Sequence, residues 1–314
     1  MVERPSELGG FLKSRRASVR PQDVGITPHP SRRRVAGLRR EELAMLAGVS
    51  ITHYTRLEQG RATGVSDSVL EALARTLRLT EDETAHLKDL ARPRTRSAPR
   101  TAPAPDSVRQ LLDAMTDVPA LLLDRCGEVL AWNPLGHALL GSHLPYEVPG
   151  GPGGTGSSGG TGGIGGTGGV NLLRMLFLDE RYRALYVDRA EEARLAVASL
   201  RIEAGRHPED RGPAELVGQL ALRSDEFAAL WARHPVRTCT SGVKELLHPA
   251  VGRLTLSFEN LVLPGPPGAP GRRMITYTAA PGSPSDAALR LLAGVARSSC
   301  APVTLPTDHS QVRR

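Results

Sequence analysis

The stretch that most constrains the fold runs from Leu38 to Gly60 and reads LRREELAMLAGVSITHYTRLEQG. Its apolar residues recur at helical spacing on both sides of Gly48, which predicts one short helix over Arg39–Ala47 and another after Ser50. Glycine adopts the positive φ that ends a helix at little cost, and serine is a favourable N-cap. Two short helices joined by such a tight turn are typical of a helix-turn-helix, whose second helix lies in the major groove of DNA.

The second helix of this stretch divides into an inner and an outer face. Val49, Tyr54 and Leu57 fall where they can pack back on the first helix. The small side chain of Ala44 allows the two backbones to approach closely. The spacing therefore favours a DNA-binding hairpin, although a helical hairpin without that role remains the alternative. The outward set is Ile51, Thr52, His53, Thr55 and Arg56.

The segment LAMLAGVSITHYTRLEQGR resembles the xenobiotic-response-element (XRE) family of bacterial repressors, close to the phage Cro and repressor pattern. On that pattern Arg40, at the start of the first helix, contacts phosphate or a base edge, and Arg56 is the best candidate for a guanine. Ile51, Thr52 and His53 face the major groove with Arg56. Thr55, Gln59 and Arg61 position the DNA backbone. The full DNA-binding set expected from the resemblance is Arg40, Ser50, Ile51, Thr52, His53, Thr55, Arg56, Gln59 and Arg61.

The positive charge of the chain is concentrated in the segment that holds this hairpin. The net charge is +7 at pH 7, and residues 1–100 contain 19 Lys and Arg against 12 Asp and Glu, whereas the remaining residues contain 21 of each. A local cationic excess favours a polyanion through phosphate contacts and counterion release. The asymmetry indicates double-stranded DNA as the partner of the N-terminal segment.

Further helical patterns complete an N-terminal domain. Apolar periodicity predicts helices over Glu7–Val19 and Ser66–Leu77. Thr80 and Glu83 form a T-x-x-E capping box, which is the signature of one more helix start. We therefore expect an all-α helix-turn-helix domain of about five helices over residues 1–91.

Composition then marks the remaining boundaries. Residues 92–107, RPRTRSAPRTAPAPDS, are rich in Pro and Arg without an apolar period, which predicts a semi-extended linker. A second domain is expected over residues 108–297, followed by a disordered tail over residues 298–314. Residues 150–169 contain thirteen glycines but no lysine, so they fit a flexible insertion rather than a phosphate-binding loop.

The second domain is predicted to contain both helices and an antiparallel sheet, so the chain as a whole is expected to be α+β. Ala-Leu-Leu-Leu in the first strand could also be helical, and this alternative stays open. The predicted helices are Leu135–Gly141, Asn171–Leu178, Leu185–Leu200, Pro213–Arg223 and Ser224–His234. The predicted strands are Ala120–Arg125, Glu128–Trp132, Val243–Leu247, Gly252–Leu263 and Met274–Thr278.

Several segments of this half are similar to the C-terminal domain of the MmyB-like regulators. The resemblance implies a PAS-like sensor domain that holds an apolar small molecule, such as a fatty acid. The expected ligand-binding residues are Trp132, Asn133, Arg174, Phe177 and Arg201. Arg174 is suited either to a carboxylate of the ligand or to a surface ion pair, and Trp132 either to a pocket wall or to core packing; both alternatives stay open. The similar segments are Asp124–Pro134, Asn171–Phe177, Ala193–Pro208, Ser224–His234 and Gly242–Glu259.

No pattern in the chain indicates an enzyme. The G-x-S-x-G and H-E-x-x-H motifs are absent, and Cys126, Cys239 and Cys300 are too far apart to form a metal motif. No cofactor or metal is expected. The absence of an apolar signal segment or membrane span predicts a cytoplasmic protein. The sequence thus predicts a homodimeric, operator-binding regulator whose second domain senses a fatty-acid-like metabolite; a pure dimerisation module is the alternative for that domain.

Overall fold

The computed structural model describes residues 7–26, 35–61, 64–91, 104–146, 169–207, 210–263 and 271–300, with side chains up to 297. Almost all of the predicted linker and glycine-rich insertion, and residues 301–314 of the predicted tail, lie outside these ranges.

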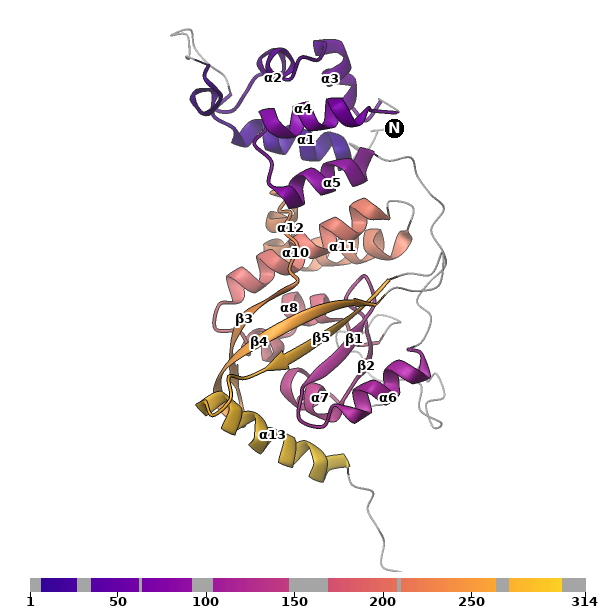
Figure 1. Ribbon diagram of the computed structural model, residues 1–314, viewed down its shortest axis with the longest axis vertical. Coiled ribbons are helices and arrows are strands. Elements are labelled where there is room, and N and C mark those ends of the chain that lie inside the picture. Colours follow the sequence, from indigo (N-terminus) through magenta and orange to yellow (C-terminus); the bar gives the residue numbers. More distant parts are fainter. Residues whose placement is uncertain are drawn as a thin grey trace, which may run out of the picture.

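The N-terminal part folds as a compact group of helices (Figure 1). Fully buried side chains from four segments, including Phe11, Leu38, Tyr54 and Leu73, form its core. The predicted capping box is present, because the Thr80 and Glu83 side chains each accept a hydrogen bond from the other's backbone amide. The helices are α1 (Glu7–Ser18), the short 3-10 helix η1 (Pro21–Val24), α2 (Arg40–Leu46), α3 (Ile51–Glu58), α4 (Asp67–Thr76) and α5 (Glu81–Ala91).

The C-terminal part is built on a five-stranded antiparallel sheet with the order β2-β1-β5-β4-β3. The strands β1 and β2 form a hairpin. The last three strands of the sequence continue the sheet on the other side of β1, where β5 pairs with β1. The chain between the end of β2 at Trp132 and the start of β3 at Ser241 makes up more than half of the domain. The strands are β1 (Ala120–Leu123), β2 (Val129–Trp132), β3 (Ser241–His248), β4 (Gly252–Leu263) and β5 (Arg272–Thr278).

Helices cover the two faces of this sheet unequally. Alternation along β1 sends Leu121 and Leu123 into the main core, whereas Ala120 and Leu122 face the opposite side. On that second side α6 (Asp106–Ala114) packs through Leu112. In Figure 1, α10 and α12 lie between the sheet and α5, and α13 lies at the opposite end of the domain. The helices of the main core are α7 (Pro134–Leu140), α8 (Leu172–Leu178), α9 (Glu180–Arg183), α10 (Arg189–Arg206), α11 (Arg211–Arg223), α12 (Asp225–Ala232) and α13 (Pro284–Cys300).

The α+β class is confirmed, but three features differ from the sequence interpretation. The helix predicted over Leu185–Leu200 begins four residues later, because α10 starts at Arg189 after Asp188, whose side chain accepts a hydrogen bond from the Glu191 amide. Helices α6 and α13 were not predicted. Because α13 continues to Cys300, its last residues overlap the predicted tail.

The described part of the chain shows neither a membrane-spanning helix nor a metal-binding cluster. No helix there combines the length and apolar character needed to span a bilayer. Among the same residues, no group of His, Cys, Asp and Glu side chains is arranged to hold a metal ion.

Candidate functional site

The helix-turn-helix is fixed by the local signals that predicted it. Gly48 has a φ of +67°, and the Ser50 hydroxyl accepts a hydrogen bond from the His53 amide at 3.1 Å, capping α3. Tyr54 and Leu57 are fully buried against the core. These contacts set the angle at which α3 leaves α2, so the opposite face of α3 is presented to solvent.

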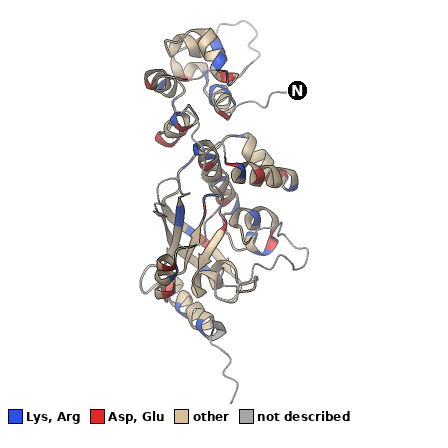
Figure 2. Cartoon of the chain, turned by 90° about the vertical axis from the view of Figure 1, so that its right-hand side faces the viewer, with Lys and Arg blue, Asp and Glu red and all other residues tan. Residues whose placement is uncertain are grey.

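That outer face carries most of the side chains expected to contact DNA. Ile51, Thr52, Arg56, Gln59 and Arg61 are exposed, and Ile51 retains 47% of its surface despite being apolar. The charged residues of these helices stand out in Figure 2. Arg56 forms no ion pair with another described residue, so its guanidinium is available for a base edge or phosphate. The two residues of the set that are half-buried on α3 are His53 and Thr55.

A buried carboxylate holds α3 to α1 and α2. The Glu58 side chain is 2% exposed and accepts hydrogen bonds from Arg16 Nε and Arg40 Nε, both at 2.6 Å, and from the Tyr54 hydroxyl at 2.7 Å. Burial alone favours the neutral acid, but the bonds from Arg16, Tyr54 and Arg40 outweigh it and lower the pKa of Glu58. Glu58 therefore remains ionised and anchors three elements at once.

This network gives Arg40 a structural role in addition to the DNA contact expected from sequence. Its Nε is bonded to Glu58, while 47% of its side chain remains exposed. Arg40 therefore holds the two helices of the motif together, and its exposed part lies beside α3. Sequence reasoning missed the role of Glu58, although a glutamate on the inward face of an amphipathic helix is the signal of a buried ion pair.

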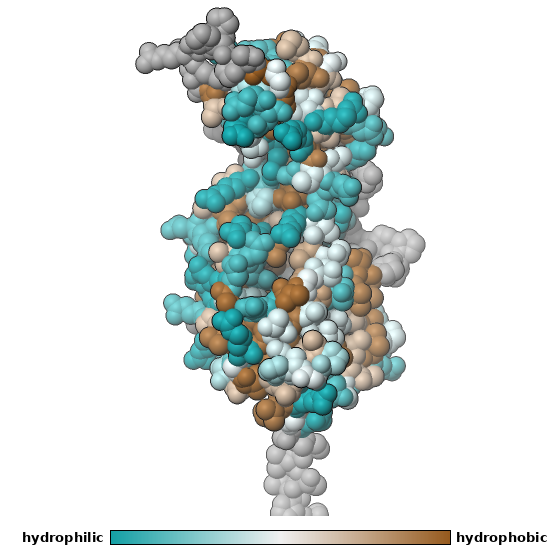
Figure 3. Space-filling model, turned by 60° about the vertical axis from the view of Figure 1, so that its left-hand side comes forward, coloured by the Kyte–Doolittle hydropathy of each residue, from teal (hydrophilic) through white to brown (hydrophobic). Residues whose placement is uncertain are grey.

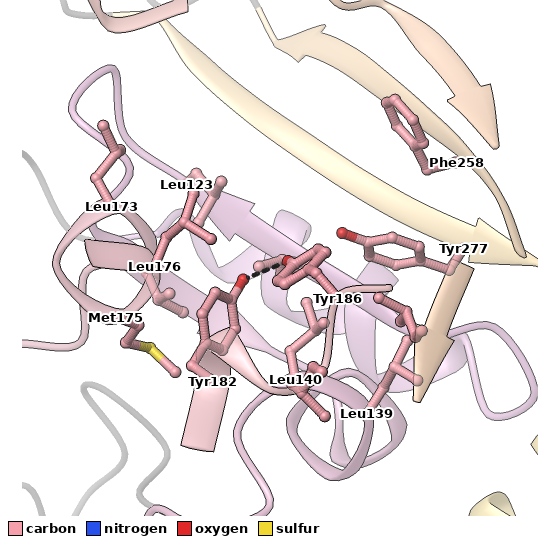
Figure 4. Packing of buried hydrophobic residues seen from close by; sticks show 14 of the residues in the cluster. Leu123, Leu139, Leu140, Leu173, Met175, Leu176, Tyr182, Tyr186, Phe258 and Tyr277 are labelled. Atoms are coloured by element: carbon pink, nitrogen blue, oxygen red, sulfur yellow. Dashed lines mark hydrogen bonds between the residues drawn. The ribbon is translucent and has the colours of Figure 1, made fainter. Parts of the chain in front are cut away.

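A cavity of about 100 Å³ lies between the sheet and the helices that cover it. Leu173 and Leu176 of α8, Tyr182 of α9, and Phe258 and Tyr277 of the sheet form much of its wall. Figure 4 shows the Tyr182 and Tyr186 hydroxyls joined by a hydrogen bond, with the Tyr277 hydroxyl pointing toward Tyr186. The wall is mostly apolar, and its few polar groups converge from different elements.

Some of these polar groups satisfy one another. Lys244 Nζ lies 2.5 Å from Glu192 Oε1 and 4.9 Å from the centre of the Phe258 ring. Burial opposes the charge of Lys244, but Glu192 outweighs this and raises the pKa of the lysine. Burial also raises the pKa of Tyr182 and Tyr186 well above the ordinary value, so both hydroxyls are neutral. The pair and the tyrosines thus leave no net charge.

Two polar atoms in the lining are buried without a hydrogen-bond partner among the described residues: Asn260 Oδ1 and Arg273 Nε. The rest of each side chain is engaged, since Asn260 Nδ2 donates to the Cys239 carbonyl at 3.0 Å and Arg273 Nη1 donates to Ser199 Oγ at 2.9 Å. A buried polar atom without a partner costs about 1–3 kcal/mol. The cavity therefore offers a guanidinium that forms no ion pair within the described chain, beside an acceptor that needs a donor.

The five residues expected to bind ligand from sequence do not line this cavity. Asn133 is a structural residue: its Oδ1 accepts from the Ala120 and Gly136 amides, and its Nδ2 donates to the Met115 and Val118 carbonyls. These four bonds use its whole hydrogen-bonding capacity. The other four lie elsewhere: Trp132 against the His137 ring, Phe177 against the Phe227 ring, Arg174 bonded to Gln219, and Arg201 bonded to Glu7.

A second, larger hollow of about 530 Å³ borders α13. Two of its lining residues, Arg290 and Arg297, are 76% and 60% exposed and pair with Asp286 and Asp117. Four of its eight lining residues are charged, so it suits an apolar molecule less well than the mostly apolar cavity beneath the sheet does. The cavity beneath the sheet is therefore the better ligand site.

Comparison with known families agrees with this division into two parts. A helix-turn-helix domain model matches residues 7–87. The model of the MmyB-like transcription regulator ligand binding domain matches residues 104–292, more than half of the chain. A search of curated proteins gives no match. These domains indicate a regulator rather than an enzyme, and the chain belongs to the family of MmyB-like transcription regulators, with a DNA-binding helix-turn-helix followed by a ligand-binding domain.

Proposed function

We propose that this regulator is cytoplasmic, binds a specific operator as a homodimer through the outer face of α3, and adjusts that binding when a small apolar acid occupies the cavity of its PAS-like second domain. The DNA-reading residues are those expected from sequence, with Arg56 reading a base. A fatty-acid-like molecule is the ligand class that we favour. No catalytic step is part of the proposal.

One observation carries the ligand assignment: the pair of buried atoms, Asn260 Oδ1 and Arg273 Nε, that lack partners in an otherwise apolar wall. A guanidinium matches the two oxygens of a carboxylate, and charge-assisted bonds of this kind are about twice as strong as neutral ones. A hydroxyl or a water carried with the ligand would supply the donor for Asn260. The leucine and aromatic walls would hold the apolar part.

The size of the cavity narrows the ligand further. Its volume of about 100 Å³ is below the roughly 300–1,000 Å³ of most small-molecule sites. A short-chain acid fits without rearrangement, whereas a long acyl chain must displace the walls. Each buried CH₂ contributes about 0.8 kcal/mol, or roughly a fourfold increase in affinity. We therefore expect affinity to rise about fourfold per CH₂ from butanoate upward and to level off once the cavity is full.

Native mass spectrometry of the purified protein, followed by denaturation and extraction, tests the proposal directly. A bound apolar acid of matching mass supports it. In titrations with octanoate, Arg273→Gln should weaken binding about 10–100-fold because a charged hydrogen bond is lost. Arg253→Gln is the matched control, since Arg253 lies on the same sheet but is 62% exposed and pairs with Glu245. Equal affinity in both variants would reject the assignment of the carboxylate to Arg273.

A dimerisation module without ligand is the second candidate for this domain, and one observation favours it. On α13, Leu291 and Val295 are 69% and 59% exposed and lie four residues apart on one helical face. Under this alternative the protein is an apo-dimer in native mass spectrometry, and Leu291→Glu converts it to a monomer. Octanoate then leaves the operator affinity unchanged.

A further inference from the structure

The two domains meet in a closely packed region, here called the domain joint, where α1 and α5 contact α10 and the end of α12. Figure 3 shows a waist at this position, with hydrophilic side chains on both sides of it. Ion pairs at its edge include Arg206 with Asp89, at 3.1 Å. The residues that form its centre are Glu7, Arg15, His86, Arg201, Gly205 and His234.

Arg201 occupies the middle of the joint and is only 1% exposed. Its Nη1 donates to Glu7 Oε2 and to His234 Nδ1, each at 3.0 Å, and its Nη2 donates to the Trp231 carbonyl. The guanidinium carbon lies 3.8 Å from the centre of the Trp231 ring. A buried charge is tolerated only when it is paired. Glu7 supplies that opposite charge, and it belongs to the DNA-binding domain.

The packing around Arg201 is tight at two glycines, each of which faces a histidine side chain. A Cβ on Gly205 would lie 2.5 Å from His86 Cε1, and one on Gly10 would lie 3.0 Å from His234 Cε1. Burial, with the charge of Arg201, lowers the pKa of His86 and of His234 to about 4. His234 is therefore neutral near pH 7, which leaves its Nδ1 free to accept from Arg201.

The helix that carries Arg201 also forms one wall of the ligand cavity. Ser199 and Leu200 line the cavity, and Ser199 accepts the hydrogen bond from Arg273. Arg201 is the next residue, only about 1.5 Å further along the helix axis. A ligand that shifts α10 at Ser199 and Leu200 would therefore also move the backbone that carries Arg201.

We propose that Arg201 is the positioning residue through which occupation of the cavity changes the docking of the DNA-binding domain. This rests on the proposed ligand binding. Because the joint is tightly packed, a shift of α10 loosens it and lowers the protection of its backbone amides against hydrogen exchange. Amide hydrogen exchange in α1 and α5 then becomes faster.

The test measures exchange in α1 and α5 of the full chain with and without octanoate. Wild type and Glu71→Gln, a variant that removes only a surface ion pair with Lys88, should both show exchange accelerated about fivefold or more, in the range of usual coupling factors. Arg201→Met should bind octanoate at least as tightly as wild type, because coupling is reciprocal, yet show no acceleration. Glu7→Gln keeps the buried arginine and removes only the interdomain charge, so its response should fall by at least half. Equal acceleration in wild type, Arg201→Met and Glu7→Gln overturns the proposal.

A second arm needs no ligand and separates the two proposals. Ser199→Leu fills the cavity at α10 and removes the partner of Arg273. It should accelerate amide exchange in α5 when it is introduced into the wild-type protein, but not when it is combined with Arg201→Met. If octanoate does not bind to wild type, the proposed ligand class fails while this arm still tests the joint. An identical effect of Ser199→Leu in both backgrounds refutes transmission through Arg201.

Discussion

The buried carboxylate of Glu58 offers the sharpest test of how the DNA-binding surface is held. Glu58→Gln preserves the shape of the side chain and removes its charge. The partner Arg16 is only 11% exposed, so the variant leaves a buried guanidinium without a counter-charge. Breaking a buried pair in this way costs about 3–5 kcal/mol. Arg40 is half exposed and adds at most about 1 kcal/mol.

We expect Glu58→Gln to destabilise the N-terminal domain by about 3 kcal/mol, near the lower limit because glutamine still accepts one hydrogen bond. For a domain of this size, that corresponds to a fall of roughly 12–24 °C in its melting temperature. Both tryptophans, Trp132 and Trp231, lie in the other domain. Circular dichroism therefore follows both domains. Because Trp231 lies at the domain joint, the fluorescence of Trp132 in a Trp231→Phe background follows the C-terminal domain, and the difference between the two signals isolates the helix-turn-helix.

The matched control is Glu71→Gln, because Glu71 pairs with Lys88 at 3.2 Å on the surface, with half of its side chain exposed. Such a pair contributes about 0–1 kcal/mol. The lowered pKa of Glu58 sets the sign of the pH dependence: its stabilisation is present above the ordinary glutamate pKa and is lost as the pH falls through the depressed value. If the two variants unfold within about 1 kcal/mol of each other, Glu58 does not anchor α3.

Two further predictions concern DNA reading and pH. Arg56→Ala should relax the choice of operator sequence by about 1–3 kcal/mol at one base pair, whereas Arg61→Ala should weaken binding to all sequences alike; binding to a set of operator variants measures both, and equal losses everywhere in both mutants contradict the division. His86, only 2% exposed beside Phe11, binds a proton near pH 4 when folded and near 6.5 when unfolded, so folding stability falls as the pH is lowered between these values. His86→Phe should remove about 3 kcal/mol of that loss of stability. The measurement is the urea midpoint of wild type and of the variant at a series of pH values. Curves of midpoint against pH that run parallel for the two proteins would contradict the prediction.

The N-terminal domain could be predicted almost to the residue because its signals are local. Ser50 and Ser66 cap α3 and α4, and the hydroxyl of each accepts the expected bond from an amide three residues on. Thr80 and Glu83 cap the next helix reciprocally. Each signal spans four residues, so no knowledge of the distant chain was needed to place a helix start.

The missed elements of the second domain show where such signals were overlooked. Ser283 caps α13 by accepting from the Asp286 amide, and Pro284 follows it at the first helical position. Serine before proline is a helix-start signal that the sequence interpretation did not use. The late start of α10 has the same origin, since the Asp188 side chain caps that helix by accepting a hydrogen bond from the Glu191 amide.

The ligand site could not be predicted in this way. Ser199, Asn260 and Arg273 lie on a helix and two strands, and only the pairing of β4 with β5 brings the last two together. Arg201 was expected from sequence to bind a ligand, but the structure pairs it with a negative charge of the protein instead. That charge is Glu7, 194 residues away in sequence and in the other domain. Non-local partners of this kind leave no mark in a spacing pattern.

Sharing α10 between the cavity and the joint has a thermodynamic consequence that limits any mechanism built on it. A ligand shifts an equilibrium only by the difference between its affinities for the two states, and the coupling is reciprocal. A tenfold change in operator affinity needs about 1.4 kcal/mol, the burial of roughly two CH₂ groups. In a series of acids from butanoate upward, the change in operator affinity must therefore grow no faster than the affinity for the acid itself. For each acid, DNA must weaken binding of the acid by the same factor by which that acid weakens binding of DNA. A coupling that kept growing after ligand affinity had levelled off would have to come from somewhere other than the cavity beside Ser199.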